Sequence, residues 1–269
     1  MKLGFIGLGN MASAIIGGIL KEGIAAPEDI TGSAKTEKTA KEKAERFGIE
    51  ACTDNRKVTE QADVLVLAVK PQFFPEVIAE IRDTLKEGTL VISVAAGKSM
   101  KYIEEQFWAS ESGRQIKLVR CMPNTPALVL EGCSGYCVNA QVSEDEKNLV
   151  KRLFSSFGKA IEVPERLMDT VGSVSGSSPA FVFMFIEALA DGAVAEGMPR
   201  KQALEFAAQA VYGSAKLVLE SGMHPEELKD MVCSPGGTTI QGVRTLEKGG
   251  MRGAVMDAVI ACVEKTRKL

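Results

Sequence analysis

Histidine is nearly absent from this chain of 269 residues, in which His224 is the only one. Histidine, the usual general acid or base, can therefore serve at one position only. The six cysteines are scattered without a CxxC pair, and Cys133 and Cys137 lie far from any histidine, so nothing indicates zinc or another metal. The pattern is typical of buried, reduced thiols in a cytoplasmic protein.

Long runs of one charge sign and long apolar runs are also missing. The net charge is −3, so we expect neither a nucleic-acid partner nor a polybasic membrane patch. No stretch approaches ~20 uninterrupted apolar residues, which argues against a membrane-spanning helix. The chain begins directly with a strand-like run, KLGFIGLG, and shows no separate signal segment with a cleavage site.

Up to about residue 163, strand patterns alternate with helix patterns. Apolar runs at 3–7, 29–33, 63–69, 89–95 and 116–121 are separated by segments with helical spacing at 11–23, 36–48, 75–85 and 101–108. Apolar strands between amphipathic helices indicate a parallel sheet that is covered on both faces. Two further runs, 132–139 and 159–163, bracket a helix that starts at a capping box formed by Ser143 and Glu146.

After Pro164 the strand pattern stops. Residues 174–197 are mostly apolar and have Pro179 near their start, which predicts a helix buried on most sides. A second long helix is predicted over 199–222, ended by Gly222. A short helix over 224–232 and two final helices, split by Gly249 and Gly250, complete this half.

These patterns predict an α/β protein with two domains. A Rossmann-type, doubly wound dinucleotide-binding domain should span residues 1–163, and an all-helical substrate-binding and dimerisation domain should span 164–269. A helix that is apolar nearly all round needs more cover than so small a domain provides. We therefore expect a homodimer built through the helical half.

The segment FIGLGNMA places Gly7, Gly9 and Ala12 in the G-x-G-x-x-G/A pattern between a strand and a helix. Gly7 permits the tight turn, Gly9 lets the backbone approach a pyrophosphate, and Ala12 keeps the helix close to the sheet. Free N–H groups and the dipole at the helix start then favour phosphate binding. In the first strand–turn–helix of an alternating chain, this pattern predicts a dinucleotide site.

The end of the second predicted strand indicates which dinucleotide binds. An NAD site usually carries Asp or Glu there for the ribose hydroxyls. This chain instead has Ser33 and Lys35, and the nearest acid, Glu37, lies inside the next helix. A hydroxyl and an ammonium suit a 2′-phosphate, which favours NADPH, with NADH as a weaker alternative. The interpretation of Lys35 as a solvated surface charge stays open.

Two other loops follow predicted strands, AVKP at 68–71 and SVAAG at 93–97. Ligands bind at the carboxyl ends of strands in such sheets, so both loops should line the dinucleotide crevice. Lys70 is the only charge in the two loops and could lie near the cofactor phosphates. In CMPNTPA, two prolines stiffen a loop in which Asn124 would offer its amide near the nicotinamide.

A second glycine-rich helix entrance, SPGGTT at 234–239, lies in the helical half. Such entrances bind anions because of their free N–H groups and the helix dipole, so two of them indicate two anionic ligands. The alternative is a purely structural corner between two helices, in which Gly236 and Gly237 are needed only because of the backbone conformation.

A general acid for carbonyl reduction is hard to find in this sequence. In 3-hydroxy acid dehydrogenases with a similar start, a lysine on the interdomain helix serves, but the corresponding segment 171–185 has no lysine. Glu187 and Asp191 lie further along, among alanines, and are better interpreted as capping or interhelix partners. A cyclic imine protonated to an iminium is already polarised, so it accepts hydride at carbon without such a donor.

The motifs GFIGLGNMA, AVKP, MPNTP, SGSSPAF and above all SPGGTT resemble those of the pyrroline-5-carboxylate reductases, over nearly the whole chain. The resemblance implies NADPH-dependent reduction of 1-pyrroline-5-carboxylate, a small substrate with a carboxylate, to L-proline, the last step of proline biosynthesis. It also implies dimers formed by interlocked helical domains, which in this family often assemble into decamers.

The resemblance implies site residues as well. Ser234 and the backbone amides of Gly237, Thr238 and Thr239 would hold the carboxylate, and the Thr239 hydroxyl, the catalytic group, would bind the ring nitrogen. The motifs and the resemblance together predict these cofactor-binding residues: Gly7, Leu8, Gly9, Asn10, Met11, Ser33, Lys35, Asn55, Ala68, Val69, Lys70, Pro71, Val94, Ala95, Ala96 and Asn124. Met231 departs from the asparagine of some members, and Lys35 replaces an acid, which reinforces the NADP preference.

Two other functions stay open at this point. A 3-hydroxy acid dehydrogenase would share the amino-terminal motif, and a non-catalytic dinucleotide sensor would use its helical half to bind a partner. Assays with NADPH against pyrroline-5-carboxylate and against 3-oxo acids separate these alternatives.

Overall fold

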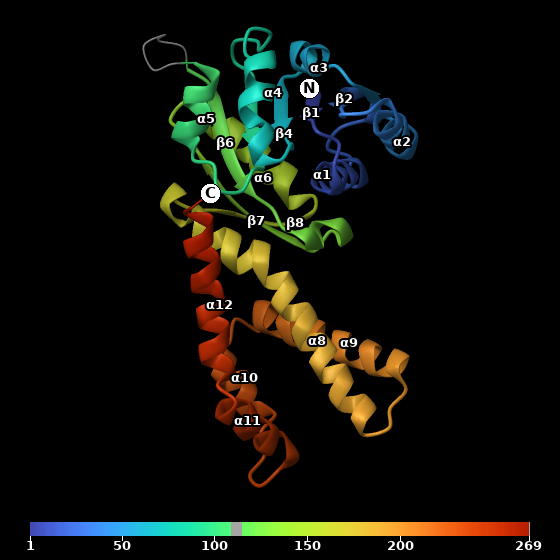
Figure 1. Ribbon diagram of the computed structural model, residues 1–269, viewed down its shortest axis with the longest axis vertical. Helices are drawn as coiled ribbons and strands as arrows, with labels where there is room; N and C mark the ends of the chain where they lie inside the picture. Colours follow the sequence, from blue (N-terminus) through green and yellow to red (C-terminus); the bar gives the residue numbers. More distant parts are fainter. Residues whose placement is uncertain (109–114, 269) are drawn as a thin grey trace. The chain divides into compact units, whose positions relative to one another are not determined.

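The computed structural model describes residues 1–108 and 115–268 (Figure 1). Its contacts divide the chain into two compact units: Met1–Ser177 with Cys262–Leu269, and Ser178–Ala261. The first unit is a doubly wound α/β domain and the second is all-helical, which confirms the predicted fold class. The boundary of these units lies beyond residue 163 because Val171 packs on Gly135 of the sheet and because Glu165 pairs with Arg120.

One sheet forms the centre of the first unit, with strand order β3-β2-β1-β4-β5-β6-β7-β8. Its strands are β1 (Leu3–Ile6), β2 (Ile30–Ser33), β3 (Glu50–Cys52), β4 (Val64–Leu67), β5 (Leu90–Ser93), β6 (Lys117–Met122), β7 (Gly132–Val138) and β8 (Gly158–Glu162). The sheet is not wholly parallel, because β7 runs antiparallel to β6. The short connection between them includes no crossover helix, and a parallel pair requires one.

Helices cover both faces of this sheet (Figure 1). They are α1 (Asn10–Lys21), α2 (Glu37–Phe47), α3 (Asn55–Gln61), α4 (Phe74–Ile81), α5 (Met100–Phe107), α6 (Glu144–Ser155) and α7 (Met168–Val171). On one face α1 and α6 pack on Phe5, Val66 and Ile92. On the other face α3, α4 and α5 pack on Leu65 and Val91. Successive strand residues thus enter opposite cores, as the pleat requires.

Strand β3 and helices α3 and α7 of the first unit were not predicted from the sequence. Strand β3 has three residues and sits at the sheet edge, so its apolar pattern is too short to recognise. Helix α3 buries only Val58 and Thr59, and it is started by Asp54, whose carboxylate accepts from two backbone N–H groups. The predicted capping box at Ser143 and Glu146 is confirmed.

A π-helical segment, Gly172–Ser177, precedes the first long helix of the second unit. The predicted helix over 174–197 therefore belongs to a longer helical stretch, Glu165–Ala195. Ser173 and Ser175 donate their hydroxyl hydrogens to the carbonyls of Asp169 and Val171. Pro179 lacks an N–H, and the carbonyl of Ser175, four residues before it, accepts from Asn124 Nδ2 instead.

The second unit consists of α8 (Ser178–Ala195), α9 (Arg200–Ser221), α10 (Pro225–Met231), α11 (Thr238–Lys248) and most of α12 (Met251–Thr266). Helix α9 ends at Gly222, and Gly249 and Gly250 separate the last two helices, both as predicted. Glu226 on α10 accepts a hydrogen bond from the Arg252 guanidinium on α12 at 2.5 Å. Together with Lys229, that guanidinium lowers the pKa of Glu226 to about 2.

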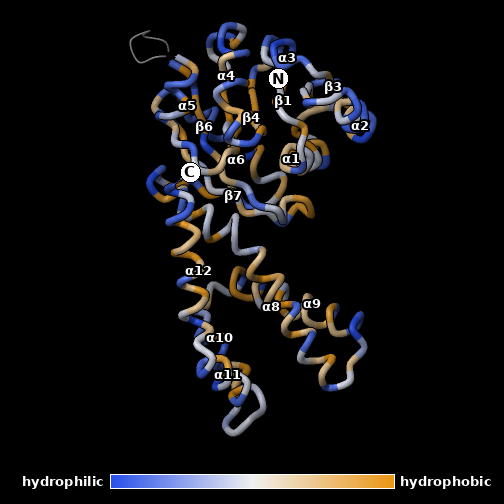
Figure 2. The backbone as a smooth tube through the Cα atoms, viewed as in Figure 1, coloured by the Kyte–Doolittle hydropathy of each residue, from blue (hydrophilic) through white to orange (hydrophobic). Residues whose placement is uncertain are grey.

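Helices α8 and α9 are rich in hydrophobic residues (Figure 2), and several of their large apolar side chains are exposed. Phe183 is 60% exposed, and Met184 and Phe206 are each 68% exposed. The prediction that 174–197 is buried on most sides is therefore not met within one chain, because α9 is the one element among the described residues that packs closely on α8. Within the described residues, the stretch Glu165–Ala195 is also the one helix long and apolar enough to cross a membrane, judged by length and composition.

Candidate functional site

A cavity of about 440 Å³ lies at the carboxyl ends of β1, β2 and β4. Strand β1 sits between β2 and β4, so successive crossovers leave it in opposite directions. Such a switch point is where open α/β sheets bind their ligands. Nine of the predicted cofactor residues line the cavity: Gly7, Leu8, Gly9, Ser33, Lys35, Asn55, Ala68, Val69 and Lys70.

Gly7 occupies a position that only glycine fits. Its φ is +94°, and a Cβ there would lie 2.9 Å from the Val69 side chain and 3.0 Å from the Val69 backbone nitrogen. The N–H groups of Gly7 and Leu8 both donate to the Ser33 carbonyl, which joins the turn to the end of β2. The turn is therefore held between the two strands that flank β1.

Gly9 starts helix α1 and leaves the helix entrance open. No side chain caps this N-terminus, and a Cβ built on Gly9 would meet nothing within 4 Å. Asn10 and Met11 form the first turn, with their backbone N–H groups at the positive end of the helix dipole. An uncapped entrance beside an open cradle fits the pyrophosphate of a dinucleotide.

The cavity also contains polar contacts between predicted residues and residues that were not predicted, among them Glu80. Ser33 donates to Asn55 Oδ1 at 2.6 Å, and Asn55 Nδ2 donates to Glu80 Oε2 at 2.7 Å. The Lys35 ammonium lies 5.6 Å from the centre of the Phe73 ring. The unpredicted lining residues are Ala34, Thr36, Thr39, Thr53, Phe73, Glu76, Val77 and Glu80. Half of them lie on α2 and α4, which no motif marks, so only the folding of the chain brings these residues to the cavity.

The remaining predicted residues do not line this cavity. Pro71 begins the turn after β4, and Val94, Ala95 and Ala96 follow β5. Asn124 has a structural role: its Nδ2 donates to the Ser175 carbonyl at 3.0 Å, and its Oδ1 accepts from the Cys133 N–H at 2.8 Å. Because both ends of this buried amide are engaged, Asn124 holds the π-helical segment to β7.

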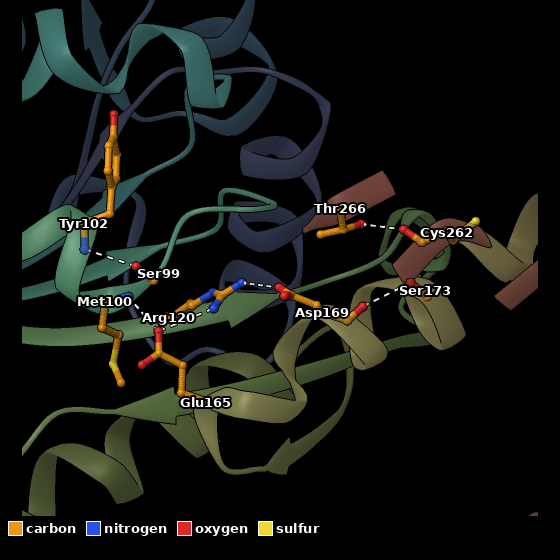
Figure 3. A network of polar contacts seen from close by, with 9 residues as sticks. All are labelled: Ser99, Met100, Tyr102, Arg120, Glu165, Asp169, Ser173, Cys262 and Thr266. Atoms are coloured by element: carbon orange, nitrogen blue, oxygen red, sulfur yellow. Dashed lines mark hydrogen bonds and ion pairs between the residues drawn. The ribbon is translucent and has the colours of Figure 1, made fainter. Parts of the chain in front are cut away.

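Arg120 on β6 joins three segments of the first unit (Figure 3). Its guanidinium, 8% exposed, contacts Glu165 at 3.4 Å and Asp169 at 3.0 Å. Glu165 also accepts from the Met100 N–H at 2.7 Å, at the start of α5. The cluster fixes the segment that follows Val94–Ala96 against the residues that lead into the π-helical turn.

The SPGGTT loop forms a tight turn before α11 in the helical unit. The Gly237 N–H donates to the Ser234 carbonyl at 3.0 Å, and Gly236 has φ +70°. A Cβ on Gly237 would lie 2.4 Å from the Ser234 hydroxyl oxygen and 3.1 Å from the Ser234 carbonyl oxygen, so a side chain there would require the Ser234 hydroxyl to rotate away. Gly237 is the N-cap of α11 with no side-chain cap, and Thr238 and Thr239 are exposed. The loop therefore offers an uncapped, 11-residue helix and a neighbouring hydroxyl to an anion.

Other reactive side chains have structural partners. His224 caps α10 by accepting from the Glu226 N–H, and Asp191 pairs with Arg200. All six cysteines are free thiols. Burial raises the pKa of Cys121 and raises that of Cys137 to about 11, so neither is a thiolate near neutral pH. The described residues contain no group of three or more His, Cys, Asp or Glu arranged to hold a metal ion.

Two family models match this chain, one in its amino-terminal half and one in its carboxyl-terminal half. Residues 165–269 match the family model for pyrroline-5-carboxylate reductase dimerisation. Residues 2–97 match the model for NADP oxidoreductase, coenzyme F420-dependent. The first match begins close to the predicted boundary of 163 and 164, and ahead of the compact helical unit.

Relatives that match over the full length of this chain are named as pyrroline-5-carboxylate reductases. The chain is 47% identical to the pyrroline-5-carboxylate reductase of Escherichia coli (strain K12), over 100% of this chain and 98% of that protein. It is 46% identical to that of Methanosarcina acetivorans, over 100% and 97%. The NADP-bound crystal structure of Plasmodium falciparum pyrroline carboxylate reductase matches with a TM-score of 0.89 and 35% identity, over 100% and 97% of the two chains. By identity over its whole length, this chain belongs to the pyrroline-5-carboxylate reductase family.

Proposed function

We propose that this protein reduces 1-pyrroline-5-carboxylate to L-proline with NADPH, the last step of proline biosynthesis. The observation that carries the proposal is the pair of uncapped glycine helix entrances, at Gly9 and at Gly237. One suits a dinucleotide pyrophosphate, and the other suits the carboxylate of a small substrate. The relatives named as pyrroline-5-carboxylate reductases and the NADP in the Plasmodium structure support the same pairing.

The first unit would hold the cofactor, which supplies a hydride when bound. The amides of Gly9, Asn10 and Met11 would bind its pyrophosphate, and Lys35 would attract a 2′-phosphate. Ala68 to Pro71 and Val94 to Ala96 follow neighbouring strands and would line its path across the sheet. Asn124 is engaged on both sides of its amide, so it would support this surface indirectly.

The helical unit would hold the substrate. Ser234 and the amides of Gly237, Thr238 and Thr239 would bind the carboxylate, and the Thr239 hydroxyl would bind the ring nitrogen and orient one face of the imine. Direct hydride transfer to the imine carbon needs no strong general acid once the nitrogen is protonated. This mechanism agrees with the structural roles of His224 and Asp191.

The assay that tests the function uses purified protein with NADPH and either pyrroline-5-carboxylate or a 3-oxo acid. We expect oxidation of NADPH with the imine. Activity with the 3-oxo acid alone would replace the proposal with a hydroxy acid dehydrogenase, and cofactor binding without any turnover would indicate a sensor.

Thr239→Ala is expected to lower kcat/KM for the imine by about tenfold or more, because one hydrogen bond to a charged group is lost. The affinity for NADPH should stay within about twofold, since this residue would contact only the substrate. Steady-state kinetics and fluorescence titration of NADPH measure the two quantities. Thr245→Ala, on the same helix with its hydroxyl bonded to the Gln241 carbonyl, is the control. Unchanged kinetics in Thr239→Ala would remove the role assigned to its hydroxyl.

We also propose that the helical unit forms a homodimer, with a decamer as a further assembly state. The exposed Phe183, Met184 and Phe206 supply the apolar surface, and the dimerisation model covers these residues. Size-exclusion chromatography with light scattering at micromolar concentration should give at least twice the chain mass of 28.7 kDa. A monomer at that concentration would contradict this assembly.

A buried dimer interface would also account for the apolar stretch Glu165–Ala195 without a membrane. The protein is then expected in the cytoplasm, without a nucleic-acid partner at its net charge of −3. Cell fractionation tests this location, and recovery in the membrane fraction would overturn it.

A further inference from the structure

The SPGGTT loop connects two helices of the second unit. Helix α10 ends at Met231, and α11 begins at Thr238. The proposed carboxylate site takes groups from both sides of this connection, because the Ser234 hydroxyl follows α10 and the amides of Thr238 and Thr239 belong to α11. These groups converge on one anion only if the two helices keep a fixed angle to each other.

The loop follows the orientation of α10, because backbone hydrogen bonds tie it to the last turn of that helix. The Val232 N–H donates to the Lys229 carbonyl at 3.2 Å, and the Cys233 N–H donates to the Asp230 carbonyl at 3.1 Å. The connection to α11 is short, so a change in the angle of α10 moves Ser234 relative to the first turn of α11.

Apolar packing within one chain does little to fix that angle. None of the residues of α10, α11 and α12 is buried. Large apolar side chains such as Leu246 on α11 and Val255 on α12 are exposed. Within one chain, the arrangement of these helices therefore depends on polar contacts between them.

Arg252, in the first turn of α12, supplies such a contact. Its Nε donates to Glu247 Oε1 at 2.6 Å, and its Nη2 donates to Glu226 Oε1 at 2.5 Å. Glu247 lies in the last turn of α11 and Glu226 in the first turn of α10, so one guanidinium joins the ends of the two helices that the SPGGTT loop does not connect. Among the described residues, the pair of Glu226 and Arg252 is the one side-chain hydrogen bond or ion pair between α10 and either later helix.

The positions of these charges are otherwise unfavourable. A cation in the first turn of a helix and an anion in the last turn both oppose the helix dipole, and Arg252 and Glu247 occupy those two positions. Their attraction to each other and to Glu226 offsets that cost. Lys229 also pairs with Glu226, at 2.5 Å, and extends the cluster to four charges. A single exposed pair contributes little to stability, whereas a network of several charges holds its geometry better.

We propose that Arg252 is a positioning residue for the substrate, which fixes α10 against α11 by bridging Glu226 and Glu247. The bridge holds Ser234 and the first amides of α11 in the arrangement that binds a carboxylate. The effect of Arg252 on the substrate passes through the two helices. The inference rests on the proposed function of the SPGGTT loop and concerns what keeps that loop in its binding form.

Arg252→Met tests the bridge, because it keeps most of the side-chain volume and removes both hydrogen bonds. The loop is then in its binding arrangement for a smaller fraction of the time, so the KM for pyrroline-5-carboxylate should rise about fivefold. We expect kcat to stay within about twofold, because bound substrate selects the same arrangement. The dissociation constant of NADPH should also stay within about twofold, since Arg252 lies outside the cofactor cavity. Steady-state kinetics at saturating NADPH and fluorescence titration of NADPH measure these quantities.

Two further variants separate the bridge from a general loss of charge. Arg200→Met removes an arginine of similar exposure, which pairs with Asp191 on α8 in the same unit, and it should leave the KM within about twofold. Glu226→Gln should raise the KM about threefold by itself. Added to Arg252→Met, it should raise the KM no further, because both substitutions break the same contact. Thermal unfolding of each variant checks that it is folded.

The outcomes distinguish this inference from the proposed function. A KM in Arg252→Met within twofold of the wild type, or an equal rise in Arg200→Met, would overturn the bridge alone. Additive effects of Glu226→Gln and Arg252→Met would also overturn it, because the two residues would then act separately. If the wild-type protein binds NADPH but does not turn over pyrroline-5-carboxylate, the proposed function fails, and the inference fails with it.

Discussion

Gly9→Ala is expected to leave the ligand-free protein as stable as the wild type and to weaken NADPH binding by about 100-fold. A Cβ on Gly9 meets nothing within 4 Å, and its φ of −79° suits any residue. The methyl group would instead stand where a pyrophosphate has to approach the amides of α1. Loss of one or two charge-assisted hydrogen bonds accounts for the expected factor. Fluorescence titration and thermal unfolding measure the two effects.

Gly7→Ala is the matched comparison for this prediction. Alanine there would have φ +94° and would contact the Val69 backbone at 3.0 Å, so the ligand-free protein itself should lose stability. The two neighbouring glycines should therefore separate a requirement of the ligand from a requirement of the fold. Normal NADPH affinity in Gly9→Ala would show that no pyrophosphate binds at this helix entrance.

Arg120→Met is expected to lower the free energy of unfolding by about 2 to 3 kcal/mol. The substitution keeps most of the side-chain volume but leaves the carboxylates of Glu165 and Asp169 without their cation. Breaking a buried pair costs about 3 to 5 kcal/mol. Both carboxylates are about one-third exposed, which reduces that cost, with exposures of 33% and 30%. Urea unfolding followed by circular dichroism gives the value.

Arg82→Met provides the control for Arg120. Arg82 is 47% exposed and contacts Asp83 at 3.9 Å, so its loss should change the free energy of unfolding by about 0.5 kcal/mol or less. Arg120→Met should also disturb the segment after Ala96, because Glu165 anchors the Met100 N–H. A stability loss in Arg120→Met no larger than that in Arg82→Met would show that this cluster does not hold the segments together.

Local sequence patterns were sufficient to predict a structural feature where the residues that determine it are close together in the sequence. The alternation of apolar runs and amphipathic helices predicted the doubly wound sheet, and the Gly7–Gly9 spacing predicted the turn at the switch point. Helix ends at Gly222 and at Gly249 and Gly250 were also predictable. In each case the backbone or side-chain requirement lies within a few consecutive residues.

Sequence patterns were not sufficient where a neighbouring strand, or a residue distant in the sequence, determines the local structure. The antiparallel direction of β7 depends on the short connection from β6, and β3 is defined only by pairing with β2. The bonds that the Asn124 amide makes with Ser175 and Cys133 were also not predictable, because these two residues lie outside the loop that the motif marks. The distances in sequence between these residues follow no helical or strand period, so the contacts could not be predicted from the sequence pattern.

The residues by themselves determined the class of fold, the two glycine helix entrances and the family to which the chain belongs, because motif and periodicity are short-range properties. The tertiary structure alone decided which side chains share the cofactor cavity with those motifs. Glu80 reaches Asn55 across 25 residues, and Arg120 reaches Glu165 across 45, because separate crossovers end at the same part of the sheet. Hydrogen bonds between such distant residues form only after the chain has packed.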